Sequence, residues 1–324
     1  MSHRSAPFSA KIHVLAPAGP VPAEKLRAGM KAADRHGAIQ WQIAPNVEQR
    51  EGYFAGDDAA RLAGILDALH DPEAHTAWCA RGGYGTTRLL TSLSQALDAN
   101  PRGEDGPGAM NPKRPFIAGF SDVTALLCWA WTFRGAPGVH GPVLTQLASL
   151  PLEDQQRAWD AIAGEPPAPL EVAGDASCVS LGGSVEGRLI IGNLEVLRSL
   201  IGTPFMPVLD GCILALEEVG ERPYRIDRAL THLHASGALR GVRGVALGQF
   251  TGCDEPEGTL SAGAPAIEVA HERLERLAVP VVSGFPFGHD PARNAALIFG
   301  GQVRLEADHG TLLSLEGLEE AARP

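Results

Sequence analysis

The order of apolar and amphipathic segments over the first 150 residues constrains the fold more than any other feature of this sequence. Short apolar runs such as KIHVLAP, IQWQIAP, HTAWCAR and PFIAGF alternate with amphipathic stretches that are long enough to form helices. This order is typical of parallel strands joined by crossover helices. Residues 1–150 are therefore predicted to form a doubly wound, mostly parallel, Rossmann-like α/β domain.

The regular alternation stops after residue 150. The content of Pro, Gly and Ala rises over residues 151–175, which we interpret as a linker between two domains. Residues 176–324 are predicted to form a smaller, mixed, β-rich α/β domain, in which the segments VRLEAD and TLLSLEG form a closing hairpin. The Gly- and Pro-rich stretch 101–114 is predicted to be a surface loop.

Charge and hydropathy limit the partners of the protein. The chain has 324 residues and a formal net charge of -11, which argues against nucleic acid because phosphate binding needs clustered Lys and Arg. The first twenty residues lack the pattern of a secretory signal, and no apolar run is long enough to span a membrane. We therefore expect a cytoplasmic protein that binds neither nucleic acid nor membranes.

Cysteine and histidine spacing gives no support for a metal or cofactor site. The five cysteines are scattered and form no C-x-x-C pair, and the histidines are also scattered apart from His232 and His234. Neither H-x-x-x-H nor H-E-x-x-H occurs. We expect reduced, mostly buried thiols, no metal and no cofactor.

The segment GFSDVTALL contains the most specific chemical signal. An apolar strand meets Ser121 and runs directly into a helix, which is the arrangement of a nucleophile elbow. The segment departs from the G-x-S-x-G pattern because Val123 stands at the position of the second Gly. Taken alone, Ser121 could equally be a helix N-cap.

A glycine-rich turn, ARGGYGT, follows the preceding strand. Gly82, Gly83 and Gly85 allow backbone conformations that expose N–H groups, so one of them could join the N–H of Asp122 in an oxyanion hole. The turn matches neither G-x-G-x-x-G nor a P-loop. An ordinary tight turn between strand and helix is the alternative.

Two further segments carry titratable groups. The strand CILALEE ends in Glu217 and Glu218, and the end of a strand in such sheets is a favoured place for catalytic carboxylates. His289 lies in a Gly- and Pro-rich loop. By themselves these residues could be a solvated charge cluster and a surface histidine.

Seven segments in this order resemble the LD-carboxypeptidase family of serine peptidases, which includes muramoyltetrapeptide carboxypeptidases and microcin C immunity proteins. The segments are VLAPAGPV, ARGGYGT, GFSDVTAL, HGPV, GRLIIGNLEVLRSLIGTP, LALEEVGERPYRIDRAL and FGHDPARNAALIFGG. The resemblance implies that Ser121 is the nucleophile, His289 the base and Glu217 the orienting acid, with Glu218 as the nearest competitor. It also implies an oxyanion hole from the N–H groups of Gly83 and Asp122, with Gly82 as an alternative to Gly83.

The resemblance implies a function as well. We expect cleavage of the L,D bond to a terminal D-Ala in cytoplasmic murein tetrapeptides, by a homodimer with its active site between the two domains. The alternatives are an immunity-type hydrolase of peptidyl or aminoacyl adenylates and a muropeptide-binding protein without activity. A class I glutamine amidotransferase would need Cys where this chain has Ser121.

Overall fold

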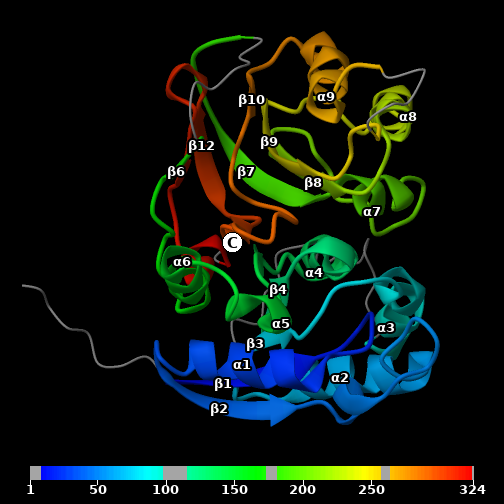
Figure 1. Cartoon of the computed structure of the whole chain (residues 1–324), viewed down its shortest axis with the longest axis vertical. Coiled ribbons are helices and arrows are strands. Elements are labelled where there is room, and N and C mark those ends of the chain that lie inside the picture. Colours follow the sequence, from blue (N-terminus) through cyan, green and yellow to red (C-terminus); the bar gives the residue numbers. More distant parts are fainter. Residues whose placement is uncertain (1–8, 98–114, 173–180, 257–262, 323–324) are drawn as a thin grey trace, which may run out of the picture.

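The computed structural model describes residues 9–97, 115–172, 181–256 and 263–322. The predicted surface loop at 101–114 lies outside these residues. Figure 1 shows two layers of sheet, one formed by the N-terminal part of the chain at the bottom and the other by the C-terminal part at the top. Within the described part of the chain, no helix is both long and apolar enough to cross a membrane.

The first sheet has six strands in the order β11-β5-β4-β3-β1-β2. Five of them are parallel, and β11 pairs antiparallel to β5 at one edge. The order 2-1-3-4-5 is one of the two common doubly wound arrangements, so the predicted fold class is confirmed. The strands are β1 (Ser9–Leu15), β2 (Ala38–Ile43), β3 (Ala74–Cys79), β4 (Phe116–Gly119), β5 (Gly138–His140) and β11 (Leu297–Phe299).

Helices cover both faces of this sheet. On one face α1 packs against α5 and α6, and on the other α2 and α3 pack beside α4. Their apolar sides face the sheet, which accounts for the amphipathic periodicity of the sequence. The helices are α1 (Ala23–Ala33), α2 (Asp58–His70), α3 (Leu90–Ala96), α4 (Thr124–Arg134), α5 (Leu144–Leu147) and α6 (Leu152–Ile162).

The second sheet has seven strands in the order β10-β9-β8-β7-β12-β13-β6. The strands from β10 to β7 are parallel, whereas β12, β13 and β6 pair antiparallel, so the sheet is mixed as predicted. The predicted hairpin is confirmed as β12 and β13. The strands are β6 (Leu170–Glu171), β7 (Ser184–Asn193), β8 (Ile213–Val219), β9 (Gly244–Thr251), β10 (Val281–Ser283), β12 (Gln302–Glu306) and β13 (Thr311–Ser314).

In the described part of the chain, helices α7 (Leu194–Ser199), α8 (Pro223–Ala235) and α9 (Ala266–Leu274) accompany the second sheet. The short α10 (Leu318–Ala321) instead lies close to Gly164 at the end of α6. Helix α7 packs on α8, and it also contacts α4 of the first layer. Helix α4 touches β7 as well. The two layers are therefore in direct contact around α4, which starts immediately after the candidate nucleophile.

The chain passes between the two sheets more than once. Strand β11 belongs to the first sheet although it follows the strands of the second, so residues 284–296 run from one sheet to the other. The segment 151–175 contains α6 and β6, and β6 pairs with the second sheet. The division into 1–150, a linker and 176–324 remains a proposal.

Candidate active site

Ser121 lies on a strained turn at the carboxyl end of β4. It begins a short 3-10 helix, Ser121–Val123, that leads into α4. Its φ of 65° is in the left-handed region, which residues other than Gly rarely adopt. Such strain between a strand and a helix is the conformation that presents the hydroxyl of a nucleophile elbow.

The missing second Gly of the elbow has a packing explanation. Gly119 has a φ of 153°, and a Cβ placed there would lie 3.1 Å from both γ-carbons of Val123. The absence of a side chain at residue 119 therefore makes room for the branched side chain of Val123. The departure from G-x-S-x-G is accommodated without loss of the turn.

The glycine turn packs directly against Ser121. A Cβ placed on Gly82 would lie 3.0 Å from the Cβ of Ser121 and 3.2 Å from its Oγ. Gly82 also accepts a backbone hydrogen bond from Gly19 N at 3.1 Å, while Gly83 has a φ of 123° that suits glycine. The structure thus brings together two segments that lie about forty residues apart in the sequence.

The Asp122 side chain ties this turn to the elbow. Its buried Oδ2 accepts hydrogen bonds from Thr86 N at 2.8 Å and from Thr86 Oγ1 at 2.5 Å. Burial raises the pKa of Asp122, and the bonds from Thr86 oppose that rise. The backbone N–H groups of Asp122 and Gly83 donate to no residue in the described part of the chain.

Replacement of Gly82 by alanine is expected to lower kcat/KM by about 10- to 100-fold, because the added methyl group would displace the Ser121 side chain by a fraction of an ångström. The φ of Gly82 is not in the left-handed region, so the backbone itself tolerates Ala. Steady-state kinetics and a thermal melt would separate the two effects. Gly263→Ala is the matched control, since a Cβ there has open space around it; equal effects of both variants would contradict the argument.

Glu217 and His289 form a close hydrogen-bonded pair. His289 Nδ1 lies 2.5 Å from Glu217 Oε2, and Glu217 is fully buried on β8. The second oxygen of Glu217, Oε1, is buried without a hydrogen-bond partner among the described residues. An ionised carboxylate beside Nδ1 favours the tautomer with the proton on Nδ1, which leaves Nε2 as the basic nitrogen.

Glu218, the competing carboxylate, points to different partners. It accepts hydrogen bonds from Asn193 Nδ2 at 2.9 Å, from Glu195 N at 2.9 Å and from Val219 N at 2.8 Å. The bond from Glu195 N means that Glu218 caps the first turn of α7. Neighbouring side chains of a strand face opposite ways, which is why Glu217 and Glu218 have different partners. Burial raises the pKa of Glu218 to about 7.

The segment that crosses between the two sheets positions His289. Gly288 has a φ of 130°, its N–H donates to Asn294 Oδ1 at 3.2 Å, and Asp290 N donates to Gln249 Oε1 at 2.9 Å. The His289 ring packs on Phe120, the neighbour of Ser121, with ring centroids 4.7 Å apart. The imidazole is thus held between Glu217 and the elbow.

His140, at the end of β5, is a site neighbour that sequence reasoning did not single out. Its ring is fully buried against Phe120 and Phe287, and both ring nitrogens lack a hydrogen-bond partner among the described residues. Burial is the larger cause and the nearby His289 the smaller cause of a pKa of His140 that is lowered to about 3. His140 is therefore neutral at physiological pH and adds no positive charge beside His289. Its place in the segment HGPV was the available signal.

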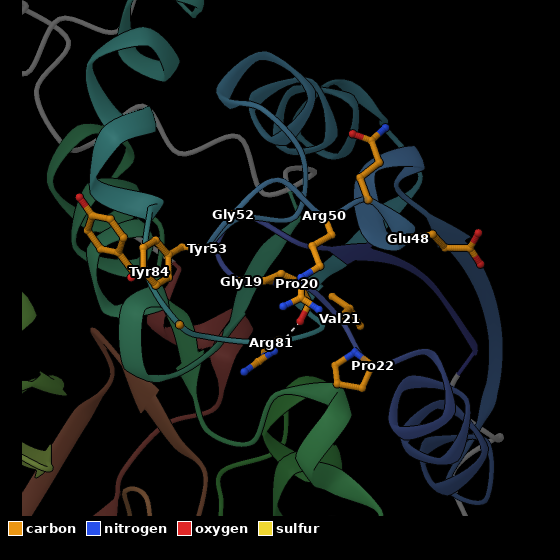
Figure 2. A pocket seen from close by; sticks show the side chains of 12 residues that line it. Gly19, Pro20, Val21, Pro22, Glu48, Arg50, Gly52, Tyr53, Arg81 and Tyr84 are labelled. Carbon is orange, nitrogen blue, oxygen red and sulfur yellow. Dashed lines mark hydrogen bonds between the residues drawn. The ribbon is translucent and has the colours of Figure 1, made fainter.

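A pocket of about 620 Å³ opens beside the glycine turn (Figure 2). Three loops line it, each following a strand of the first sheet: residues 19–22 after β1, residues 48–53 after β2 and residues 81–84 after β3. None of the five tryptophans lines this pocket. Within the described part of the chain, no group of three or more His, Cys, Asp or Glu side chains could hold a metal ion.

Known proteins match the chain over most of its length. Residues 12–141 match the LD-carboxypeptidase N-terminal domain and residues 186–305 match the LD-carboxypeptidase C-terminal domain. The murein tetrapeptide carboxypeptidase of Pseudomonas aeruginosa is 33% identical over 319 residues, covering 93% of this chain and 95% of that protein. The microcin C7 self-immunity protein MccF of Escherichia coli is 26% identical over 272 residues, or 73% of each chain.

A solved structure of a peptidase has the same fold as this chain. The muramoyltetrapeptide carboxypeptidase of Oxalobacter formigenes matches with a TM-score of 0.78 and 28% identity, covering 95% of this chain and all of that one. The fold is therefore the two-domain α/β fold of these peptidases. The chain belongs to the LD-carboxypeptidase family of serine peptidases.

Proposed function

We propose that this protein is a serine carboxypeptidase that removes the terminal D-Ala from murein tetrapeptides by cleaving its L,D peptide bond. The observation that carries the proposal is the hydrogen bond of His289 to the buried Glu217, made by an imidazole that packs on the residue before Ser121. The named relatives from Pseudomonas aeruginosa and Oxalobacter formigenes support the substrate class.

In the proposed reaction, Ser121 Oγ attacks the scissile carbonyl while His289 Nε2 accepts its proton. Glu217 holds the ring in the required tautomer and stabilises the imidazolium. The unpaired N–H groups of Asp122 and Gly83 are oriented by the elbow and the glycine turn, and they would bind the oxyanion. His289 then protonates the departing amine of D-Ala, and a water molecule activated by the same imidazole releases the tripeptide from Ser121.

An immunity-type hydrolase of aminoacyl adenylates is the second candidate. Recognition of a nucleobase favours an aromatic ring that can stack. The pocket beside the glycine turn contains two such rings, Tyr53 and Tyr84, whose residues are 79% and 53% exposed. The relationship to the MccF protein supports this candidate as well.

The glutamine amidotransferase alternative loses its support. Cys128 is buried in the middle of α4, and burial raises the pKa of its thiol far above the ordinary value. A buried thiol of this kind stays protonated and is a poor nucleophile. A cytoplasmic location and a homodimer remain parts of the proposal, which fractionation and light scattering would test.

One assay separates the candidates. The protein would be incubated with L-Ala-γ-D-Glu-meso-diaminopimelate-D-Ala and, separately, with an aminoacyl-sulfamoyl adenosine, and the products would be identified by mass spectrometry. We expect release of D-Ala from the tetrapeptide. Cleavage of the adenosine compound alone would favour the immunity-type function, and binding without cleavage of either would favour the silent muropeptide-binding protein.

A further inference from the structure

The pocket of Figure 2 lies where the topology of the first sheet reverses. Strand β1 is flanked by β2 on one side and by β3 on the other, and the pocket is lined by the loops that follow all three strands. In open α/β sheets, ligands bind in the crevice outside the carboxyl ends of the strands at such a switch point. The location thus indicates a binding site that adjoins the Ser121 elbow without containing it.

Two arginines of this pocket form no ion pair with a carboxylate of the described residues. Arg81 immediately precedes the glycine turn and donates from Nη1 to the carbonyl oxygen of Pro20 at 2.6 Å. Arg50 makes no hydrogen bond or ion pair within the described part of the chain. In Figure 2 the Arg50 side chain extends toward Pro20, the residue that Arg81 holds.

Among the described residues, the one carboxylate that lines the pocket does not neutralise the positive charges of Arg50 and Arg81. Glu48 is the acidic residue of the lining, and in Figure 2 its carboxylate points away from both guanidinium groups. By contrast, nearby Arg61 and Arg88 are both paired with Asp58. The pocket thus combines two guanidinium groups that form no ion pair among the described residues with a single lining carboxylate that points away from them.

We propose that Arg81 and Arg50 form a subsite for a carboxylate of the peptide substrate. The inference rests on the proposed function and deepens it. Guanidinium groups bind carboxylates through paired hydrogen bonds. Arg81 lines the pocket, and its bond to the carbonyl oxygen of Pro20 uses only part of its donor capacity while restricting the side chain. Arg81 is adjacent to Gly82, which touches Ser121, so this carboxylate would help to place the scissile bond.

The substrate offers three carboxylates, and the test is designed to tell them apart. They belong to D-Glu, to the side chain of diaminopimelate and to the terminal D-Ala. Ser121→Ala provides a background in which the intact tetrapeptide can be titrated by calorimetry. Arg81→Gln, Arg81→Lys and Arg50→Gln would be added to this background, and each protein would be titrated with the tetrapeptide and with three analogues that each carry one carboxamide.

Both Gln variants are expected to weaken binding of the tetrapeptide by about 10-fold, with Arg81→Lys in between, because a charge-assisted hydrogen bond at a partly exposed site contributes modestly. With the analogue that lacks the bound carboxylate, the loss should fall below about twofold. Arg240→Gln is the matched control. It is exposed, without an ion pair in the described residues, and lies near the start of β9, away from the pocket.

Unchanged affinity of the Arg81 and Arg50 variants for the tetrapeptide would overturn the subsite. It would also be overturned if the arginine substitutions weakened binding of all three analogues by the same factor. Thermal melts of each variant would show that the fold is intact. Cleavage by the unmodified protein is measured separately. If it cleaves the tetrapeptide while the arginine variants bind normally, the subsite alone is wrong; if it cleaves nothing yet binding depends on the arginines, the proposed function alone is wrong.

Discussion

Replacement of Ser121 by alanine is expected to lower kcat by about 10⁴- to 10⁶-fold, the range typical for loss of the nucleophile from such triads. The fold should remain, because the Ser121 side chain makes no hydrogen bond to the described residues and Ala tolerates a φ of 65° about as well as Ser. D-Ala release from the tetrapeptide would be followed together with the melting temperature, which we expect to change by no more than a few degrees.

Ser149→Ala serves as the matched control for this variant. Ser149 is exposed, and its hydroxyl donates to the carbonyl oxygen of Gln146, so the substitution removes the same oxygen without touching the site. Its turnover should equal that of the unmodified protein. If purified Ser121→Ala kept more than about a tenth of the activity, Ser121 would not be the nucleophile.

Replacement of Glu217 by glutamine is expected to lower kcat by about 10² to 10⁴, with a smaller effect on KM. The amide keeps the shape of the side chain but removes the negative charge that stabilises the His289 imidazolium. Its NH2 group can also face Nδ1 and favour the wrong tautomer of the ring. Kinetics on the tetrapeptide would measure the effect.

Glu218→Gln is the control that shows whether the kinetic effect is specific to Glu217. Glu218 has a similar burial but contacts Asn193 and the start of α7, so its loss should affect stability more than turnover. Burial raises the pKa of Glu218 to about 7, so its side chain is partly protonated at neutral pH. Replacement by a neutral amide should therefore destabilise the fold less than it would at a fully ionised carboxylate. If the kinetic effects of the two variants were reversed, Glu218 would be the orienting acid.

Local patterns account for most of what could be predicted about the fold. The alternation of apolar runs and amphipathic stretches predicted β1 to β4 with helices between them, because strand and helix periodicities are properties of neighbouring residues. The hairpin of β12 and β13 was predicted for the same reason. The place of β11 could not be predicted, since residues 297–299 pair with β5 from the far end of the chain.

The candidate site also contains residues that local sequence patterns predict and residues that only the tertiary structure reveals. Sequence motifs and the family resemblance identified Ser121, Glu217 and His289, since each lies in a short segment with its own pattern. The sequence could not decide between Glu217 and Glu218 as the partner of His289. Both carboxylates are buried, and only their hydrogen-bond partners in the structure distinguish them. His140 and Arg81 carried too weak a local signal to be chosen.

By itself, the sequence determined the two kinds of sheet, the elbow at Ser121 and the membership of a peptidase family. Tertiary structure alone decided which distant segments meet: the glycine turn against Ser121, and the crossing segment that holds His289 on Phe120 and Glu217. The physical reason is that hydrophobic periodicity and turn chemistry act between neighbours in the chain. Strand order, the hydrogen bond of Arg81 to Pro20 and the burial of His140 depend instead on how distant segments and whole layers pack.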